Sequence, residues 1–201
     1  MRTWEWQKYL DAQRREHGKT VFSVAEMANI ARLSPESLNV QLARLIKRGV
    51  LLRYARGVYG LPEGLTASEL LYSMDSHAYV TSVSALFHHG MITQRPSLFV
   101  CFTDRRHNRS RERTTPAGRF VFVTVKKPVY FPPVNKNIAP PEQALCDFVY
   151  LMRRSGIDPQ GTVTFRNLNR LGKSFLKDTL RRYPGTVQKH VSSIVKQNET
   201  G

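Results

Sequence analysis

The chain has 201 residues, which is enough to bury one or two hydrophobic cores. Hydrophobic residues make up 41% and charged residues 23% of the sequence, so disorder along the whole chain is excluded. Lys and Arg number 31 against 15 Asp and Glu, and the resulting net charge of +16 indicates a polyanionic partner, either nucleic acid or an anionic membrane.

The sequence favours nucleic acid over a membrane as that partner. No apolar run reaches the roughly 18 residues that span a bilayer, and residues 1–10 do not have the pattern of a signal peptide. Cys101 and Cys146 lie far apart, which indicates reduced thiols rather than a disulfide or a metal site. We therefore expect a cytoplasmic protein with no membrane partner, no metal and no other cofactor. The charge is spread along the chain, with net +5 in residues 1–64 and +11 in residues 65–201.

Two helices are predicted at the start of the chain. Apolar residues at helical spacing indicate a helix over residues 4–16, which Gly18 ends. A shorter helix over residues 24–31 follows Ser23. The hydroxyl of Ser23 and the carboxylate of Glu26 are spaced as a capping box, in which each side chain accepts a hydrogen bond from a backbone amide of the first turn.

A third helix and a β-hairpin come next. Ser34 is the expected N-cap of a helix over residues 35–48, because proline is favoured at the first helical position that follows it. Leucines four and three residues apart give this helix a buried stripe. Two short strands over residues 50–54 and 58–61 flank a connection that contains Gly57.

This order of elements predicts an N-terminal winged helix-turn-helix DNA-binding domain over residues 1–64. The alternative is a helical hairpin that only packs. The side chains expected at DNA lie on the free face of the third helix, at its N-cap and on the hairpin: Ser34, Ser37, Val40, Gln41, Arg44, Lys47, Arg48, Arg53 and Arg56. Those near the start of the helix can reach base edges, and the cations can read bases or hold phosphates. The alternative for the cations is a solvated helix face, and the winged-helix context favours DNA contact.

The remaining residues, 65–201, predict an α+β C-terminal domain. Expected helices cover residues 67–74, 79–89 and 139–152, and expected strands cover residues 97–103, 120–125 and 129–131. Residues 161–201 read as a basic helical extension. A dense arginine run lies between the first two strands and is either a mobile charged loop or a second basic surface, comprising Arg105, Arg106, Arg109, Arg111, Arg113 and Arg119.

Three segments in the same order resemble the AbiEi-type antitoxins of type IV toxin–antitoxin systems. The first runs through residues 34–59, the second includes residues 82–90 with Pro96, and the third covers residues 139–147, so the resemblance extends over about residues 23–153. It implies an autoregulatory transcriptional repressor that binds operator repeats in double-stranded DNA. It also implies a C-terminal domain that opposes a nucleotidyltransferase-like toxin or contacts that toxin's RNA substrate.

Two other classes of protein stay open at this stage. A nuclease or restriction-related enzyme could use the winged helix for targeting, and an RNA-binding protein would also carry this charge. A metal nuclease, however, needs a carboxylate where Thr124 stands, two residues before Lys126. Glu142 and Asp147, five apart on one helix, face different directions. We therefore expect no catalytic residues and no enzyme.

Overall fold

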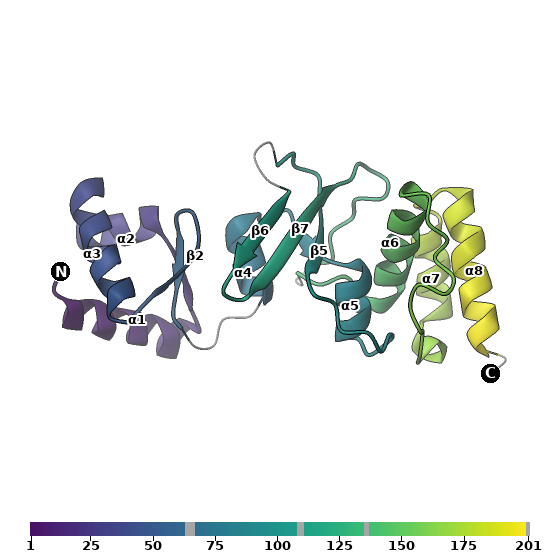
Figure 1. Cartoon of the computed structure of the whole chain (residues 1–201), viewed down its shortest axis with the longest axis horizontal. Coiled ribbons are helices and arrows are strands. Elements are labelled where there is room, and N and C mark those ends of the chain that lie inside the picture. Colours follow the sequence, from purple (N-terminus) through teal and green to yellow (C-terminus); the bar gives the residue numbers. More distant parts are fainter. Residues whose placement is uncertain (63–66, 108–110, 135–136, 200–201) are drawn as a thin grey trace. The chain divides into compact units, whose positions relative to one another are not determined.

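The computed structural model describes residues 1–62, 67–107, 111–134 and 137–199 (Figure 1). Contacts group the chain into two compact units, Met1–Ser76 with Thr114–Ala117, and His77–Arg113 with Gly118–Gly201. The chain is mixed α+β, as the sequence predicted. The expected boundary at residue 64 lies outside the described residues, and the contacts keep the helix that follows it, α4 (Ala67–Met74), with the first unit.

The first unit combines helices with a small antiparallel sheet. The three predicted helices and the hairpin are confirmed to within two residues at each end, whereas the first strand was not predicted. A strand of three residues is too short to show a period of two. It pairs with the second hairpin strand, so that the sheet order is β1-β3-β2. The elements are α1 (Thr3–His17), β1 (Val21–Ser23), α2 (Val24–Ala31), α3 (Pro35–Lys47), β2 (Leu52–Ala55) and β3 (Val58–Gly60).

Side-chain caps fix where α2 and α3 begin. The Ser23 hydroxyl accepts a hydrogen bond from the Glu26 amide at 3.2 Å, and the Ser34 hydroxyl accepts one from the Ser37 amide at 3.4 Å. Each cap satisfies one of the amides that a helix N-terminus leaves without an intrahelical partner. The Glu26 carboxylate accepts a hydrogen bond from Lys19, so only the serine half of the predicted capping box is seen.

The hairpin depends on two glycines. Gly57 has a φ of +76°, which glycine adopts readily, and it lies in the turn between β2 and β3. Gly60 is required for space, because a Cβ there would lie 2.8 Å from the Thr20 carbonyl oxygen and 2.9 Å from the Tyr54 ring. The Tyr54 hydroxyl donates to the Leu61 carbonyl at 2.9 Å, which closes the base of the hairpin.

The core of the first unit forms between α1, α2, α3 and the sheet. All three leucines of the α3 stripe, Leu38, Leu42 and Leu45, are fully buried against it. Burial of such a side chain is worth roughly 1.5–3 kcal/mol. The stripe therefore fixes the rotation of α3 about its own axis, and the opposite face is left outside the core.

A mixed sheet has the order β4-β5-β7-β6, in which β4 is antiparallel and β7 parallel to β5. Its strands β4, β5 and β7 and the first two residues of β6 belong to the second unit. Two of the predicted elements were wrong, and the strand β6 was not predicted. The helix expected from residue 79 begins only at Ser82, because Tyr79 and Val80 pair with β5. Residues 129–131 form no strand, because the chain turns there and the Tyr130 amide bonds to the Lys126 carbonyl. The elements are β4 (Tyr79–Val80), α5 (Ser82–His88), β5 (Phe99–Thr103), β6 (Glu112–Thr115), β7 (Gly118–Thr124), α6 (Pro141–Arg154), η1 (Leu168–Arg170), α7 (Lys173–Leu180) and α8 (Gly185–Glu199).

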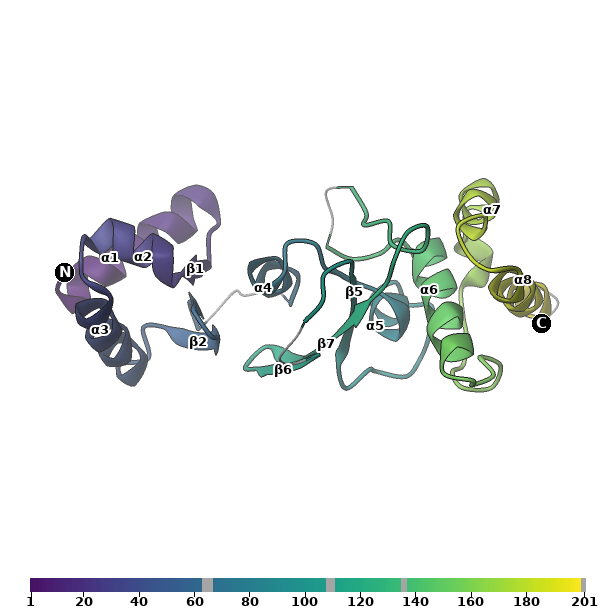
Figure 2. The same ribbon diagram turned by 90° about the horizontal axis from the view of Figure 1, so that it is seen from above.

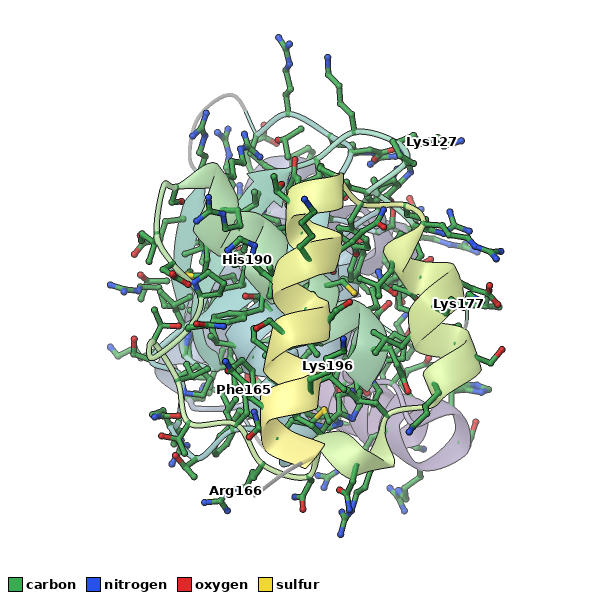
Figure 3. All side chains as sticks on the ribbon, turned by 90° about the vertical axis from the view of Figure 1, so that its right-hand side faces the viewer. Lys127, Phe165, Arg166, Lys177, His190 and Lys196 are labelled. Carbon is green, nitrogen blue, oxygen red and sulfur yellow. The ribbon has the colours of Figure 1, made fainter. Side chains whose placement is uncertain are left out.

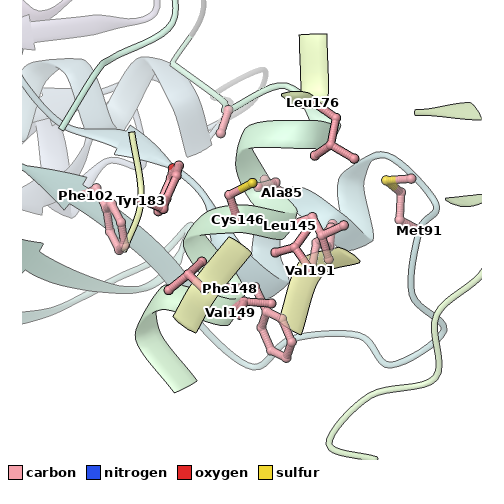
Figure 4. Packing of buried hydrophobic residues seen from close by; sticks show 14 of the residues in the cluster. Ala85, Met91, Phe102, Leu145, Cys146, Phe148, Val149, Leu176, Tyr183 and Val191 are labelled. Carbon is pink, nitrogen blue, oxygen red and sulfur yellow. The ribbon is translucent and has the colours of Figure 1, made fainter. Parts of the chain in front are cut away.

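Helix α6 is the centre of the second unit. It lies between α5 on one side and α7 and α8 on the other (Figures 1 and 2). Leu145, Phe148 and Val149 of α6 are buried in a cluster with residues of all three neighbouring helices (Figure 4). Leu176 of α7 and Val191 of α8 belong to that cluster, so α7 and α8 are integral to the core rather than a basic helical extension.

A carboxylate is buried in this apolar centre. Asp147 of α6 has no exposed surface, and it accepts hydrogen bonds from the hydroxyls of Thr81 at 2.6 Å, Tyr183 at 2.6 Å and Tyr79 at 3.4 Å. Burial raises the pKa of Asp147 to about 7, although the three hydrogen bonds act in the opposite direction. Asp147 therefore ties β4 and the turn after α7 to α6.

We predict that Asp147 makes the stability of the second unit depend on pH. Its pKa is 3.8 in a model compound and about 7 when folded, so the native state holds a proton between these values that the unfolded state releases. Stability is therefore highest at low pH and falls by about 4 kcal/mol as pH rises to 7, at 1.36 kcal/mol per pH unit. The substitution Asp147→Asn should remove this fall in urea titrations followed by circular dichroism between pH 4.5 and 8.

Tryptophan fluorescence supplies the control, because both tryptophans, Trp4 and Trp6, lie in the first unit. The transition seen by fluorescence should be the same in both proteins at every pH. Parallel pH profiles by circular dichroism would show that Asp147 does not titrate in this range.

Candidate nucleic-acid interface

Helix α3 exposes a polar and basic face opposite its leucine stripe. Ser37, Val40, Arg44 and Lys47 recur at spacings of three and four residues, and all are exposed. Val40 is an apolar side chain that is 51% exposed in the middle of this face. An exposed face of this composition at a capped helix can contact a polyanion and an apolar group together.

The sequence predicted that Gln41 belongs to this exposed face, but the structure places it elsewhere. It is half-buried, and its side-chain oxygen accepts a hydrogen bond from the indole N–H of Trp6 at 2.7 Å. Trp6 is fully buried, and a buried indole needs an acceptor. Gln41 therefore joins α3 to α1. The only sequence feature related to this role is Trp6 on the apolar face of the first helix, whose indole N–H needs an acceptor once it is buried.

Two further residues of the predicted interface also make contacts within the unit. Arg48 follows the end of α3, and its guanidinium donates to the Thr3 hydroxyl at the start of α1. Ser34 serves as the N-cap, and its hydroxyl donates to that of Ser37 at 3.2 Å. Both side chains are exposed, but both are already engaged in the local structure.

The hairpin carries the remaining two predicted residues. Arg53 lies on β2, where it pairs with Tyr59, and Arg56 lies in the turn that leads to β3. Both are exposed. Together with Arg44 and Lys47, they are exposed cations of the predicted interface, and Arg48 is the one that is bonded to Thr3 of α1.

The predicted second basic surface does not form one cluster. Arg105 donates to the His77 ring at 2.7 Å, and the other nitrogen of that ring bonds to Asp104 at 2.8 Å. Arg119 forms an ion pair with Glu112 at 3.2 Å. Arg109 lies outside the described residues.

Arg113 is also held within the structure. Its guanidinium bonds to the His107 ring at 3.1 Å and lies 5.2 Å from the centre of the Phe122 ring. Arg106 and Arg111, in contrast, line a cavity of about 1120 Å³ in the second unit.

Sequence reasoning missed most of this cavity, because its cations come from segments far apart in the chain. Lys126 and Lys127 follow β7, Arg154 ends α6, and Arg181 and Arg182 follow α7. The available signal was three pairs of adjacent basic residues, each at the end of a predicted element. Among the described lining residues, none is Asp or Glu.

The carboxylates considered for an enzyme have structural partners. Glu142 accepts a hydrogen bond from the Gly172 amide at 2.7 Å, and Asp147 is enclosed by hydroxyls. The Thr124 hydroxyl donates to the Arg105 carbonyl at 3.0 Å. Within the described ranges, no three His, Cys, Asp or Glu side chains gather as metal ligands would.

Two further observations concern the cysteines and the helices. Cys101 and Cys146 are both buried thiols without a disulfide. None of the helices in the described part of the chain combines the length and apolarity needed to cross a membrane.

Comparison with known proteins shows a similarity of fold to a solved structure. No protein-family model matches the chain, and no curated protein matches it. The crystal structure of the RV2827C protein from Mycobacterium tuberculosis is similar, with a TM-score of 0.59 and 12% sequence identity, over 98% of this chain and 78% of that one. At this identity the similarity is one of fold.

We predict that Gln41 stabilises the first unit whereas its neighbour Val40 does not. Gln41→Ala leaves the buried indole N–H of Trp6 without its acceptor, which should cost about 1–3 kcal/mol of unfolding free energy. Val40→Ala changes an exposed side chain and should stay within about 0.5 kcal/mol of the parent. Urea unfolding followed by tryptophan fluorescence measures both, and equal effects of the two substitutions would contradict the role given to Gln41.

Proposed function

We propose that the first unit is a winged helix-turn-helix that binds specific double-stranded DNA. The proposal is supported by the element order, since a helix, a short strand, two helices and a hairpin that pairs with the first strand is the arrangement of winged-helix units. The net charge of +16 favours a polyanionic partner.

The exposed face of α3 is the observation that carries the proposal. In a helix-turn-helix the second helix enters the major groove and places its side chains on base edges. In this role Ser37 and Val40 contact bases near the start of α3, and Val40 suits the methyl group of thymine. Arg44 reads guanine, while Lys47, further along the helix, holds a phosphate.

The hairpin is the wing of this unit. Arg53 and Arg56 then contact phosphates or the minor groove beside the site that α3 reads. Gln41 and Arg48 serve the interface indirectly, because they hold α3 against α1 and so set the direction in which its basic face points.

We further propose that the protein is a transcriptional repressor and antitoxin of the AbiEi type. It would bind operator repeats near its own gene, and its second unit would oppose a nucleotidyltransferase-like toxin or contact that toxin's RNA substrate. This part rests on the resemblance of residues 34–59, 82–96 and 139–147 to that family.

We predict that Arg44 and Arg56 contribute differently to DNA binding. Arg44→Ala should remove about 1–3 kcal/mol of discrimination between a selected duplex and a scrambled one, whereas Arg56→Ala should weaken both duplexes equally. For the parent protein, about five neutralised phosphates give a slope of log K against log[salt] near −4 to −5. Fluorescence anisotropy titrations measure the affinity for both duplexes and its dependence on salt.

Arg14→Ala is the matched control, because Arg14 is exposed on α1 of the same unit. It should leave both affinities almost unchanged. A flat salt dependence would contradict DNA binding itself, whereas identical behaviour of the Arg44 and Arg56 variants would contradict the assignment of α3 as the recognition helix.

We predict that toxin relief does not need the DNA-binding face. The full-length double variant Arg44→Ala with Arg56→Ala should relieve the growth arrest caused by the neighbouring toxin gene as well as the parent does, because the relieving surface lies in the second unit. A growth assay with both genes on separate inducible promoters measures this. Failure of the double variant where the parent succeeds would contradict the separation of the two functions, and a neighbouring gene without toxicity would contradict the antitoxin assignment.

A further inference from the structure

The charged side chains that line the cavity of about 1120 Å³ in the second unit are all basic among the described residues. Five arginines and two lysines line it, and its described lining residues include no carboxylate. Pockets for small apolar ligands usually measure 300–1,000 Å³ and have mostly hydrophobic walls. This cavity is larger and cationic, so it fits an extended anion better than a compact apolar ligand.

Part of this charge is already balanced by the protein. Arg181 forms an ion pair with Asp178 at 3.2 Å, and the guanidinium of Arg182 lies 4.5 Å from the centre of the Phe131 ring. Arg154 donates to the Thr124 carbonyl at 3.4 Å. These contacts hold the arginines in place at the wall, as an anion-binding surface requires.

Lys126 and Lys127 are the two lysines of the cavity wall. Both are exposed, they lie two and three residues after the end of β7, and Lys127 is labelled in Figure 3. Like charges held in a concave site repel one another and concentrate the positive potential there, so an incoming polyanion gains from all of them together.

The wall also contains aromatic rings in fixed positions. Tyr150 is half-buried and packs edge-on against Tyr183 at 6.3 Å. The hydroxyl of Tyr183 is held by Asp147 at 2.6 Å in the core. Because Tyr183 is buried, Tyr150 is the ring of this pair that a base can approach. Single-strand-binding proteins combine cations that follow the phosphate backbone with aromatic rings on which bases stack.

We propose that this cavity binds the backbone of a single-stranded nucleic acid. Duplex DNA is read by an element that projects into its groove, whereas a concave site receives a strand whose bases are unpaired. An acidic protein segment would need a dense run of carboxylates to match the six cations of the cavity other than Arg181, whereas each nucleotide supplies one negative charge. The proposal rests on the second unit alone and does not depend on duplex binding by the first.

The test is a charge reversal at the cavity edge in the full chain, Lys126→Glu with Lys127→Glu. The probes are labelled 12-nucleotide single strands of DNA and of RNA with the same sequence, a random duplex and a polyglutamate peptide, all measured by fluorescence anisotropy. We expect affinity for the single strands to fall at least tenfold. The slope of log K against log[salt] should become shallower by about 1.4, since each phosphate contact contributes about 0.7.

The control variant makes the same charge change at exposed positions outside the cavity, Lys177→Glu with Arg166→Glu, both of which are labelled in Figure 3. It should bind single strands within about twofold of the parent. Circular dichroism and thermal melting of both variants show whether the fold is kept. Loss with only one of the two single strands supports the site and assigns the sugar that it prefers.

Three outcomes would overturn the proposal. Equal weakening by the cavity and control variants would mean that only the overall charge matters. A parallel loss of duplex affinity would make the cavity part of a duplex surface. Loss of polyglutamate binding with unchanged single-strand binding would identify an acidic protein surface as the ligand.

Discussion

The cost of burying charge determines where the functional surfaces of this protein form. An unpaired cation inside a protein core costs many kcal/mol, so the 31 Lys and Arg residues must lie on faces that the hydrophobic stripes leave free. In α3 the buried stripe of Leu38, Leu42 and Leu45 leaves Arg44 and Lys47 on the opposite face. The position of each basic surface is thus a consequence of the apolar pattern.

The same constraint explains which features could be predicted from the sequence. Local patterns identified the helices of the first unit, their serine caps and the hairpin, because each depends on residues that are close in the chain. Long-range partners were not predictable in this way. Neither the pairing of β1 with β3 nor the bond from Trp6 to Gln41 has a sequence period, and both decide where predicted residues finally point.

The cavity in the second unit also depends on long-range contacts that the sequence does not predict. The run of arginines between β5 and β7 was visible in the sequence, but the fold separates its members into ion pairs, ring contacts and cavity wall. The cavity obtains its other cations from the ends of β7, α6 and α7. A cation at the end of a helix or strand can extend into solvent instead of packing in the core. Where β7, α6 and α7 end close together, their terminal cations line one cavity.

Asp147 is an ionisable side chain that is fully buried, and it connects the core of the second unit to the cavity wall. Its carboxyl group is buried, and the partners that it has among the described residues are three hydroxyls rather than a cation. One of them belongs to Tyr183, which lines the cavity and follows Arg181 and Arg182 in the chain. A buried polar group that is fully hydrogen-bonded holds its partners in one geometry. The hydrogen bond from Tyr183 to Asp147 therefore fixes the chain to the core around α6 directly after Arg181 and Arg182, while Asp178 and the Phe131 ring contact the two guanidinium groups.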